Sequence, residues 1–219
     1  MNIKKIAIPA VLSVVALGLG FWVAGKLFDP GTGSLDQQVT PEGLQGYMLS
    51  PARKIAVPTL VKGNGSSFTG NDVKGHWTAM FFGYTNCPDI CPTTMAVLVQ
   101  AKKQAATQGV EFPEVVFVSV DPERDKVEML GEYVGYFDKD FTGVTGDSKL
   151  IDALARQMSV VYMRVPSVTD DPDNYQVDHS AGILLLNPEG KLTAFLTAPH
   201  TPTGIVDSIQ AIINHTPPA

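Results

Sequence analysis

The only two cysteines of the chain, Cys87 and Cys91, stand four positions apart in the sequence CPDICP. An apolar run that ends at Gly83 precedes them, and a helical pattern begins after Pro92. The pair is therefore expected on a strand-to-helix turn, with Pro92 at the first helical position and Cys91 near the helix N-terminus. The unpaired N–H groups at such a terminus favour a thiolate. Two thiolates that can meet are able to form a disulfide or to hold a soft metal ion.

A soft metal ion bound by two thiolates needs at least one further ligand in most geometries, and the chain offers four histidines. His179 stands beside Asp178 in a predicted loop just before a strand, from which an imidazole could swing over the cysteine turn. His76, His200 and His215 are expected at the far end of a strand, at the entry to the last helix and in the C-terminal tail. A single histidine is more often a surface or structural residue than a ligand, so only His179 is retained as a candidate.

The elements that must position these residues follow from the hydrophobic periodicity of the chain. Strands are predicted over 76–83, 115–120, 160–165, 181–186 and 191–196, and helices over 93–108, 147–158 and 203–213, with a further helix through Val134. Strand, helix, strand, helix, then a hairpin and a final helix is the order of an α/β, thioredoxin-like fold.

Sites in sheets of this class lie at the carboxyl ends of the strands. Asp121 follows the strand 115–120 directly, so it is expected beside the cysteine turn. Asp125 is expected to be the N-cap of the helix that ends at Val134.

An uncharged apolar run fills positions 6–25, between Lys5 and Lys26. As a helix it is long enough to cross the roughly 30 Å hydrocarbon layer of a bilayer. The lysines before it favour a cytoplasmic N-terminus, and no convincing cleavage site follows it. We therefore expect an uncleaved transmembrane helix within an anchor at 1–28, crossing a bacterial inner membrane once, with the soluble domain facing the periplasm or outside. A cleaved signal peptide is the alternative.

The rest of the chain is expected to form a linker with an edge segment, 29–54, and one folded domain, 55–215. The edge segment lies at 44–49, and a hairpin at 55–69 opens the domain. The acidic stretch 170–173 is expected to be the tip of an excursion, and no role is assigned to it.

The net charge of the chain and the expected location of its domain limit the classes of function. The net charge of −6 and the absence of a basic patch argue against a nucleic-acid partner. Outside the cytoplasm the default role of a cysteine pair is a structural disulfide. A bond that closes so short a loop removes little chain entropy, however, so the spacing favours redox or metal chemistry.

Three motifs taken together resemble the Sco/SenC family: GYTNCPDICP at 83–92, VSVDPERD at 118–125 and DHS at 178–180. The similarity runs from about Phe68 to about Ile213. Members of this family are membrane-anchored, thioredoxin-like copper proteins that serve the assembly of cytochrome c oxidase. Asn86 departs from the commoner loop, since many members carry a histidine at that place.

The resemblance implies that Cys87, Cys91 and His179 bind copper, as Cu(I), as Cu(II) or as both. It implies that Asp121 lines the site and supports the ligands or the partner surface, and Asp178, the neighbour of His179, is taken as a second site-lining residue. The implied function is that of a metallochaperone that delivers copper to the CuA centre of oxidase subunit II, with an upstream copper chaperone as a further partner. The anchor would confine donor and acceptor to one surface and raise their effective concentration.

No turnover is implied, so the protein is not expected to be an enzyme unless it acts as a thiol-disulfide reductase. That is the main alternative function: an oxidoreductase that keeps the cysteines of the CuA site reduced, with one cysteine attacking and the other resolving. It needs Cys87 and Cys91 but not His179. A peroxidase is a weaker interpretation, because no activating arginine is evident in the cysteine loop.

Overall fold

The computed structural model describes residues 37–165 and 175–216. The predicted membrane anchor and the acidic stretch 170–173 lie outside these residues. Within the described parts of the chain, no helix combines the length and the apolar character that crossing a membrane requires.

The described strands form two sheets. The larger has nine strands in the order β1-β2-β11-β10-β5-β6-β7-β3-β4, and β8 pairs with β9 in a separate hairpin. Only the pairs β5–β6 and β6–β7 are parallel. The strands are β1 (Gln37–Val39), β2 (Gly46–Lys54), β3 (Leu60–Lys62), β4 (Ser67–Phe68), β5 (Thr78–Gly83), β6 (Glu114–Ser119), β7 (Thr142–Thr145), β8 (Tyr162–Val165), β9 (Gln176–His179), β10 (Ile183–Leu186) and β11 (Lys191–Leu196).

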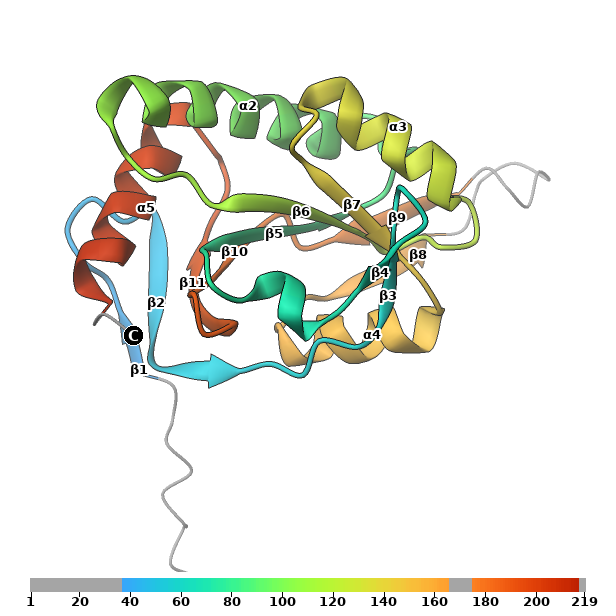
Figure 1. Cartoon of the computed structure of the whole chain (residues 1–219), viewed down its shortest axis with the longest axis horizontal. Helices are drawn as coiled ribbons and strands as arrows, with labels where there is room; N and C mark the ends of the chain where they lie inside the picture. The colour runs from blue at the N-terminus through green and yellow to red at the C-terminus, as the bar shows by residue number, and fades with distance from the viewer. Residues whose placement is uncertain (1–36, 166–174, 217–219) are drawn as a thin grey trace, which may run out of the picture. The chain divides into compact units, whose positions relative to one another are not determined.

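The helices cover both faces of the larger sheet. They are η1 (Gly70–Val73), α2 (Ile90–Gln108), α3 (Val127–Phe137), α4 (Ser148–Gln157) and α5 (Pro202–His215). Figure 1 shows α2 and α3 along one face, with α4 on the opposite face. The helix α5 packs against α2.

The core is built on β5, whose six residues are all buried. A parallel strand covered on both faces is expected to be apolar throughout, because neither of its faces meets water. The helix α2 packs Met95, Leu98, Ala101 and Ala105 into the same core at intervals of three and four residues. It ends at Gly109, which adopts the left-handed conformation (φ 68°) that ends many helices.

The predicted order of strands and helices is confirmed, with shifted boundaries. The helix that carries Cys91 begins at Ile90, so Pro92 is its third residue and the prediction of Pro92 at the first position is wrong. A proline is accommodated there because the N–H groups of the first turn have no partner within the helix.

Three local predictions are also wrong. The helix α3 has Lys126 as its N-cap, so Asp125 does not cap it. The segment 44–49 belongs largely to β2, which lies between β1 and β11 and is therefore not an edge. His179 is not in a loop: it ends β9, where it pairs with Tyr162 of β8.

A candidate metal centre

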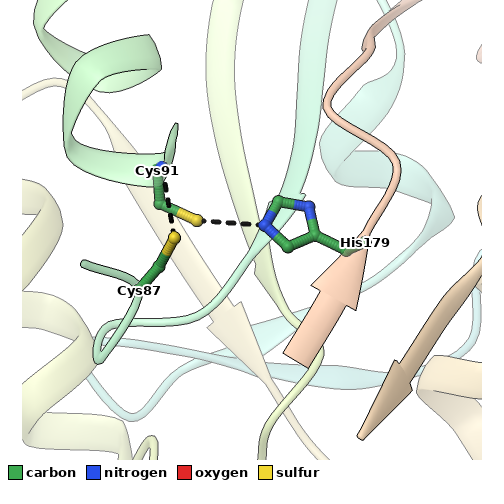
Figure 2. A group of neighbouring side chains, drawn as sticks. All are labelled: Cys87, Cys91 and His179. Carbon is green, nitrogen blue, oxygen red and sulfur yellow. Dashed lines mark hydrogen bonds between the residues drawn. The ribbon is translucent and has the colours of Figure 1, made fainter. Parts of the chain in front are cut away.

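Three side chains from three different elements meet at the carboxyl end of β5. Cys87 lies in the loop after β5, Cys91 is the second residue of α2, and His179 ends β9 (Figure 2). The ligand atoms of all three lie within 4.8 Å of one another, and the described residues contain this one group able to hold a metal ion. His179 Nε2 lies 3.3 Å from Cys91 Sγ, and the backbone N–H of Cys91 donates to Cys87 Sγ at 3.4 Å.

The two sulfur atoms differ in charge and exposure. Both cysteines are free thiols, Cys91 buried and Cys87 half-buried. The interaction with the Cys91 side chain lowers the pKa of Cys87 to about 3. The same interaction, together with burial, raises the pKa of Cys91. The site therefore holds one thiolate and one thiol at neutral pH, and binding of a metal ion to both sulfurs releases the proton of Cys91.

The tautomer of His179 follows from its backbone contact. Its Nδ1 lies 3.1 Å from the carbonyl oxygen of Ser180. A carbonyl oxygen only accepts, so Nδ1 carries the proton and the lone pair of Nε2 faces Cys91. The rings of Phe81 and Tyr84 meet the imidazole edge-on, with centroids 6.0 and 6.1 Å away.

The loop that carries Cys87 is held by a buried carboxylate that the sequence analysis misread. Asp125 is 1% exposed and accepts hydrogen bonds from Ser119 Oγ at 2.6 Å and from the backbone N–H and hydroxyl of Thr85 at 3.0 and 2.6 Å. Burial raises the pKa of Asp125, against the lowering effect of these bonds. Its place four residues after Asp121, at the same edge of the sheet, is compatible with this role as well as with a helix cap.

The sequence-predicted site-lining residues do not join the cluster. Asp121 lies at this edge of the sheet and is 1% exposed, but its oxygens accept from Arg124 Nε at 2.5 Å and from the Tyr175 hydroxyl at 2.6 Å. Asp178 is exposed on β9. Because successive side chains of a strand point to opposite faces, Asp178 faces away from the side on which His179 lies.

The three other histidines lie away from the metal centre, and His215, predicted in the tail, is instead the last residue of α5. His76 Nε2 lies 3.2 Å from a carboxylate oxygen of Glu114 at the opposite end of β5. His200 Nε2 contacts the carbonyl oxygen of Ala181 (2.8 Å), and His215 Nδ1 contacts that of Ala211 (2.7 Å).

Fold and site together define a class of protein: an α/β domain with a cysteine pair at the start of its first crossover helix and an imidazole that completes a soft-metal site. The family model described as SCO1/SenC matches residues 50–214. The chain belongs to this family.

Comparison with individual proteins also supports membership of this family. The human "Protein SCO2 homolog, mitochondrial" is 39% identical over 140 residues, which is 64% of this chain and 52% of the relative. The chain thus spans about half the length of that relative. The crystal structure of Arabidopsis thaliana ScoI with copper bound is 34% identical, with a TM-score of 0.66 over 72% of this chain and 96% of that chain. The structure of Bradyrhizobium japonicum ScoI with copper bound is 31% identical, with a TM-score of 0.59 over 72% and 98%. The family and the thioredoxin-like fold predicted from the sequence are confirmed.

Proposed function

We propose that this protein is a copper-binding protein of cytochrome c oxidase assembly that delivers copper to the CuA centre of subunit II. The observation that carries the proposal is the convergence of Cys87, Cys91 and His179 within 4.8 Å. It is supported by the family to which the chain belongs, because two of its members have been solved with copper bound.

The donor set suits copper. Two thiolates and an imidazole form a compact trigonal site for Cu(I), and one additional weak ligand allows Cu(II). Of the three ligands, the two sulfurs lie on the loop and helix that follow β5, whereas His179 is on the separate hairpin β8–β9. A ligand on a separate element can detach without disturbing the others, as release to an acceptor requires.

The second candidate is a thiol-disulfide oxidoreductase for the cysteines of the acceptor. It is favoured by the low pKa of the half-buried Cys87. The Cys87 thiolate would attack an acceptor disulfide, forming a mixed disulfide and freeing one acceptor thiolate. Cys91, losing its proton, would then attack Cys87 Sγ, so that the acceptor leaves as a dithiol and this protein is left with the Cys87–Cys91 disulfide.

Replacement of His179 separates the two functions, because copper binding needs it and thiol exchange does not. In His179→Ala, the affinity for Cu(I) should fall by more than the roughly 10- to 100-fold that follows loss of a partner of a metal ligand. The cysteine pair should remain redox-active, with a reduction potential shifted only by the loss of the His179 contact to Cys91. Competition with a Cu(I) chelator and titration with a thiol redox buffer measure these two quantities. His76→Ala, at the opposite end of β5, is the matched control and should behave as the wild-type protein.

The same variants decide the role in cells. Loss of copper from subunit II in His179→Ala, with the thiols of its CuA site still reduced, is the result expected of delivery. Normal loading of subunit II in that variant would contradict delivery and leave the oxidoreductase.

We also propose the arrangement around the membrane predicted from the sequence. Residues 1–28 anchor the chain in the inner membrane, and the copper-binding domain, whose sheet includes β1 and β2, faces the periplasm or outside. Confinement to the membrane that holds the oxidase raises the effective concentration of the donor. An upstream copper chaperone loads the site.

A further inference from the structure

A cluster of aromatic and charged side chains lies beside the metal centre. The ring of Tyr175, which is 8% exposed, contacts two guanidinium groups. The Cζ atom of Arg124 lies 3.6 Å from the ring centroid, and that of Arg164 lies 4.1 Å from it. Both cations are thus within the roughly 6 Å at which cation–π attraction acts.

Hydrogen bonds join the same residues to a buried carboxylate. The Tyr175 hydroxyl donates to Asp121 Oδ1 at 2.6 Å, and Arg124 Nε donates to Asp121 Oδ2 at 2.5 Å. Arg124 Nη1 also donates to the backbone oxygen of Tyr175 at 2.9 Å. Arg164 pairs with Glu123 at 2.9 Å. Burial and the bond to Asp121 raise the pKa of Tyr175 to about 12, so its hydroxyl remains a donor at neutral pH.

These contacts connect two parts of the fold. Asp121, Glu123 and Arg124 follow β6 of the large sheet, whereas Arg164 and Tyr175 belong to or adjoin the strands of the β8–β9 hairpin. No described strand of the large sheet pairs with this hairpin, so its position depends on side-chain contacts and on its short connections to α4 and β10. At β8, the Tyr162 hydroxyl bonds Asp152 of α4. At β9, Tyr175 is one of the residues that hold the hairpin, beside Val177, which is buried in the core.

The hairpin matters because it carries His179, four residues beyond Tyr175 on the same extended segment. A second route also leads from the cluster to the imidazole. Arg124 Cζ lies 5.6 Å from the centroid of the Tyr84 ring, which in turn meets the His179 ring edge-on. A shift of Tyr175 therefore moves the start of β9, and a shift of Arg124 alters one of the rings packed on the imidazole.

We propose that Tyr175, held on Asp121 by Arg124 and Arg164, is a positioning residue that keeps His179 over the cysteine pair and thereby sets how tightly copper is retained. The inference rests on the proposed function, because it takes His179 as a copper ligand. It assigns Asp121 a role other than metal binding: both of its oxygens already accept hydrogen bonds from the residues that hold the hairpin.

The test compares variants of Tyr175 in the reduced, Cu(I)-loaded full chain. Tyr175→Leu removes the ring and the hydroxyl, and the affinity for Cu(I) should fall about 10-fold, as for lost partners of metal ligands. Tyr175→Phe keeps the ring against the guanidinium groups and should lose less. Tyr47→Leu is the matched control: Tyr47 also stacks on a neighbour, Phe195, but lies on β2, three strands from β5 in the sheet. Its affinity should not change.

A double-mutant comparison shows whether the effect runs through His179. In a His179→Ala background, Tyr175→Leu should cause no further loss of affinity for Cu(I). An equal further loss in that background, or no loss in the wild-type background, would overturn the inference. Failure of the proposed function looks different, since His179→Ala would then retain copper by itself.

A variant at the surface keeps the test possible if Tyr175→Leu does not fold. If thermal unfolding shows that Tyr175→Leu does not fold, Arg164→Met tests the same contact, because the Arg164 side chain is 48% exposed and its removal leaves the core intact. Its affinity should fall in the same direction in the wild-type background and should not fall in the His179→Ala background. Unchanged affinity in the wild-type background would contradict the inference.

Discussion

At the scale of single residues, the two cysteines are chemically unequal although the sequence presents them as a symmetric pair. The pKa of Cys87 is lowered and that of Cys91 is raised, so the negative charge belongs to the more exposed of the two. A half-buried thiolate is suited to meeting an incoming metal ion or a disulfide, and a buried thiol is suited to completing either reaction.

This inequality predicts how alkylation depends on pH. The thiolate is the reactive form, and the pKa of Cys87 near 3 lies below the range from pH 5 to 8. Iodoacetamide should therefore modify Cys87 of the reduced apoprotein at a nearly constant rate across that range and should spare Cys91, as mass spectrometry can show. In the unfolded chain both rates should rise with pH towards the ordinary thiol pKa of about 8.5.

The control variant removes the Cys91 side chain, which lowers the pKa of Cys87. In Cys91→Ala the pKa of Cys87 should rise, so that its alkylation at pH 5 slows. A rate for Cys87 in the wild-type protein that increases about 10-fold with each pH unit, as for an ordinary thiol below its pKa, would contradict the assignment.

At the scale of elements, the end of β5 supports the buried sulfur directly. A Cβ atom on Gly83 would lie 2.7 Å from Cys91 Sγ and 2.9 Å from an edge atom of the Phe117 ring. The strand backbone and the first turn of α2 can approach this closely only because residue 83 has no side chain.

Gly83→Ala should therefore displace Cys91 and misalign the donor set. We expect a fall in Cu(I) affinity of at least about 10-fold and a loss of about 1–3 kcal/mol in the free energy of unfolding from overpacking. Chelator competition and urea unfolding measure the two effects. Gly135→Ala is the matched control, because a Cβ there has no neighbour within 4 Å. In helix α3 the change to alanine should stabilise slightly. Wild-type affinity in Gly83→Ala would show that this contact does not position the sulfur.

The limits of sequence reasoning also appear at this scale. The strands of the core were predicted because apolar residues run through them, and Cys87, Cys91 and His179 were predicted from their motifs. The strand β9 was missed because its sequence, QVDH, carries no apolar run, and it forms only by pairing with β8. The role of Asp125 was misread because a carboxylate at this place suits either a helix cap or a buried acceptor, and only the path of the turn decides between them.

At the scale of the whole molecule, the site depends on the complete domain. Cys91 and His179 are 88 positions apart, and the hairpin that carries His179 is held by contacts with the ends of other elements. Copper binding to all three ligands therefore requires the folded chain, and conversely it should stabilise that fold, because a ligand that binds only the native state shifts unfolding. The proposed membrane anchor would then hold the protein at the membrane, while the domain contains the metal site.

The most direct test of this account is the copper content and coordination of the reduced full chain, prepared without oxygen and studied by metal analysis and X-ray absorption. The account predicts one Cu(I) per chain with two sulfur ligands and one nitrogen ligand, and loss of the nitrogen ligand in His179→Ala. A chain that retains no copper at one equivalent, or that binds it without both sulfur atoms, would contradict the central claim.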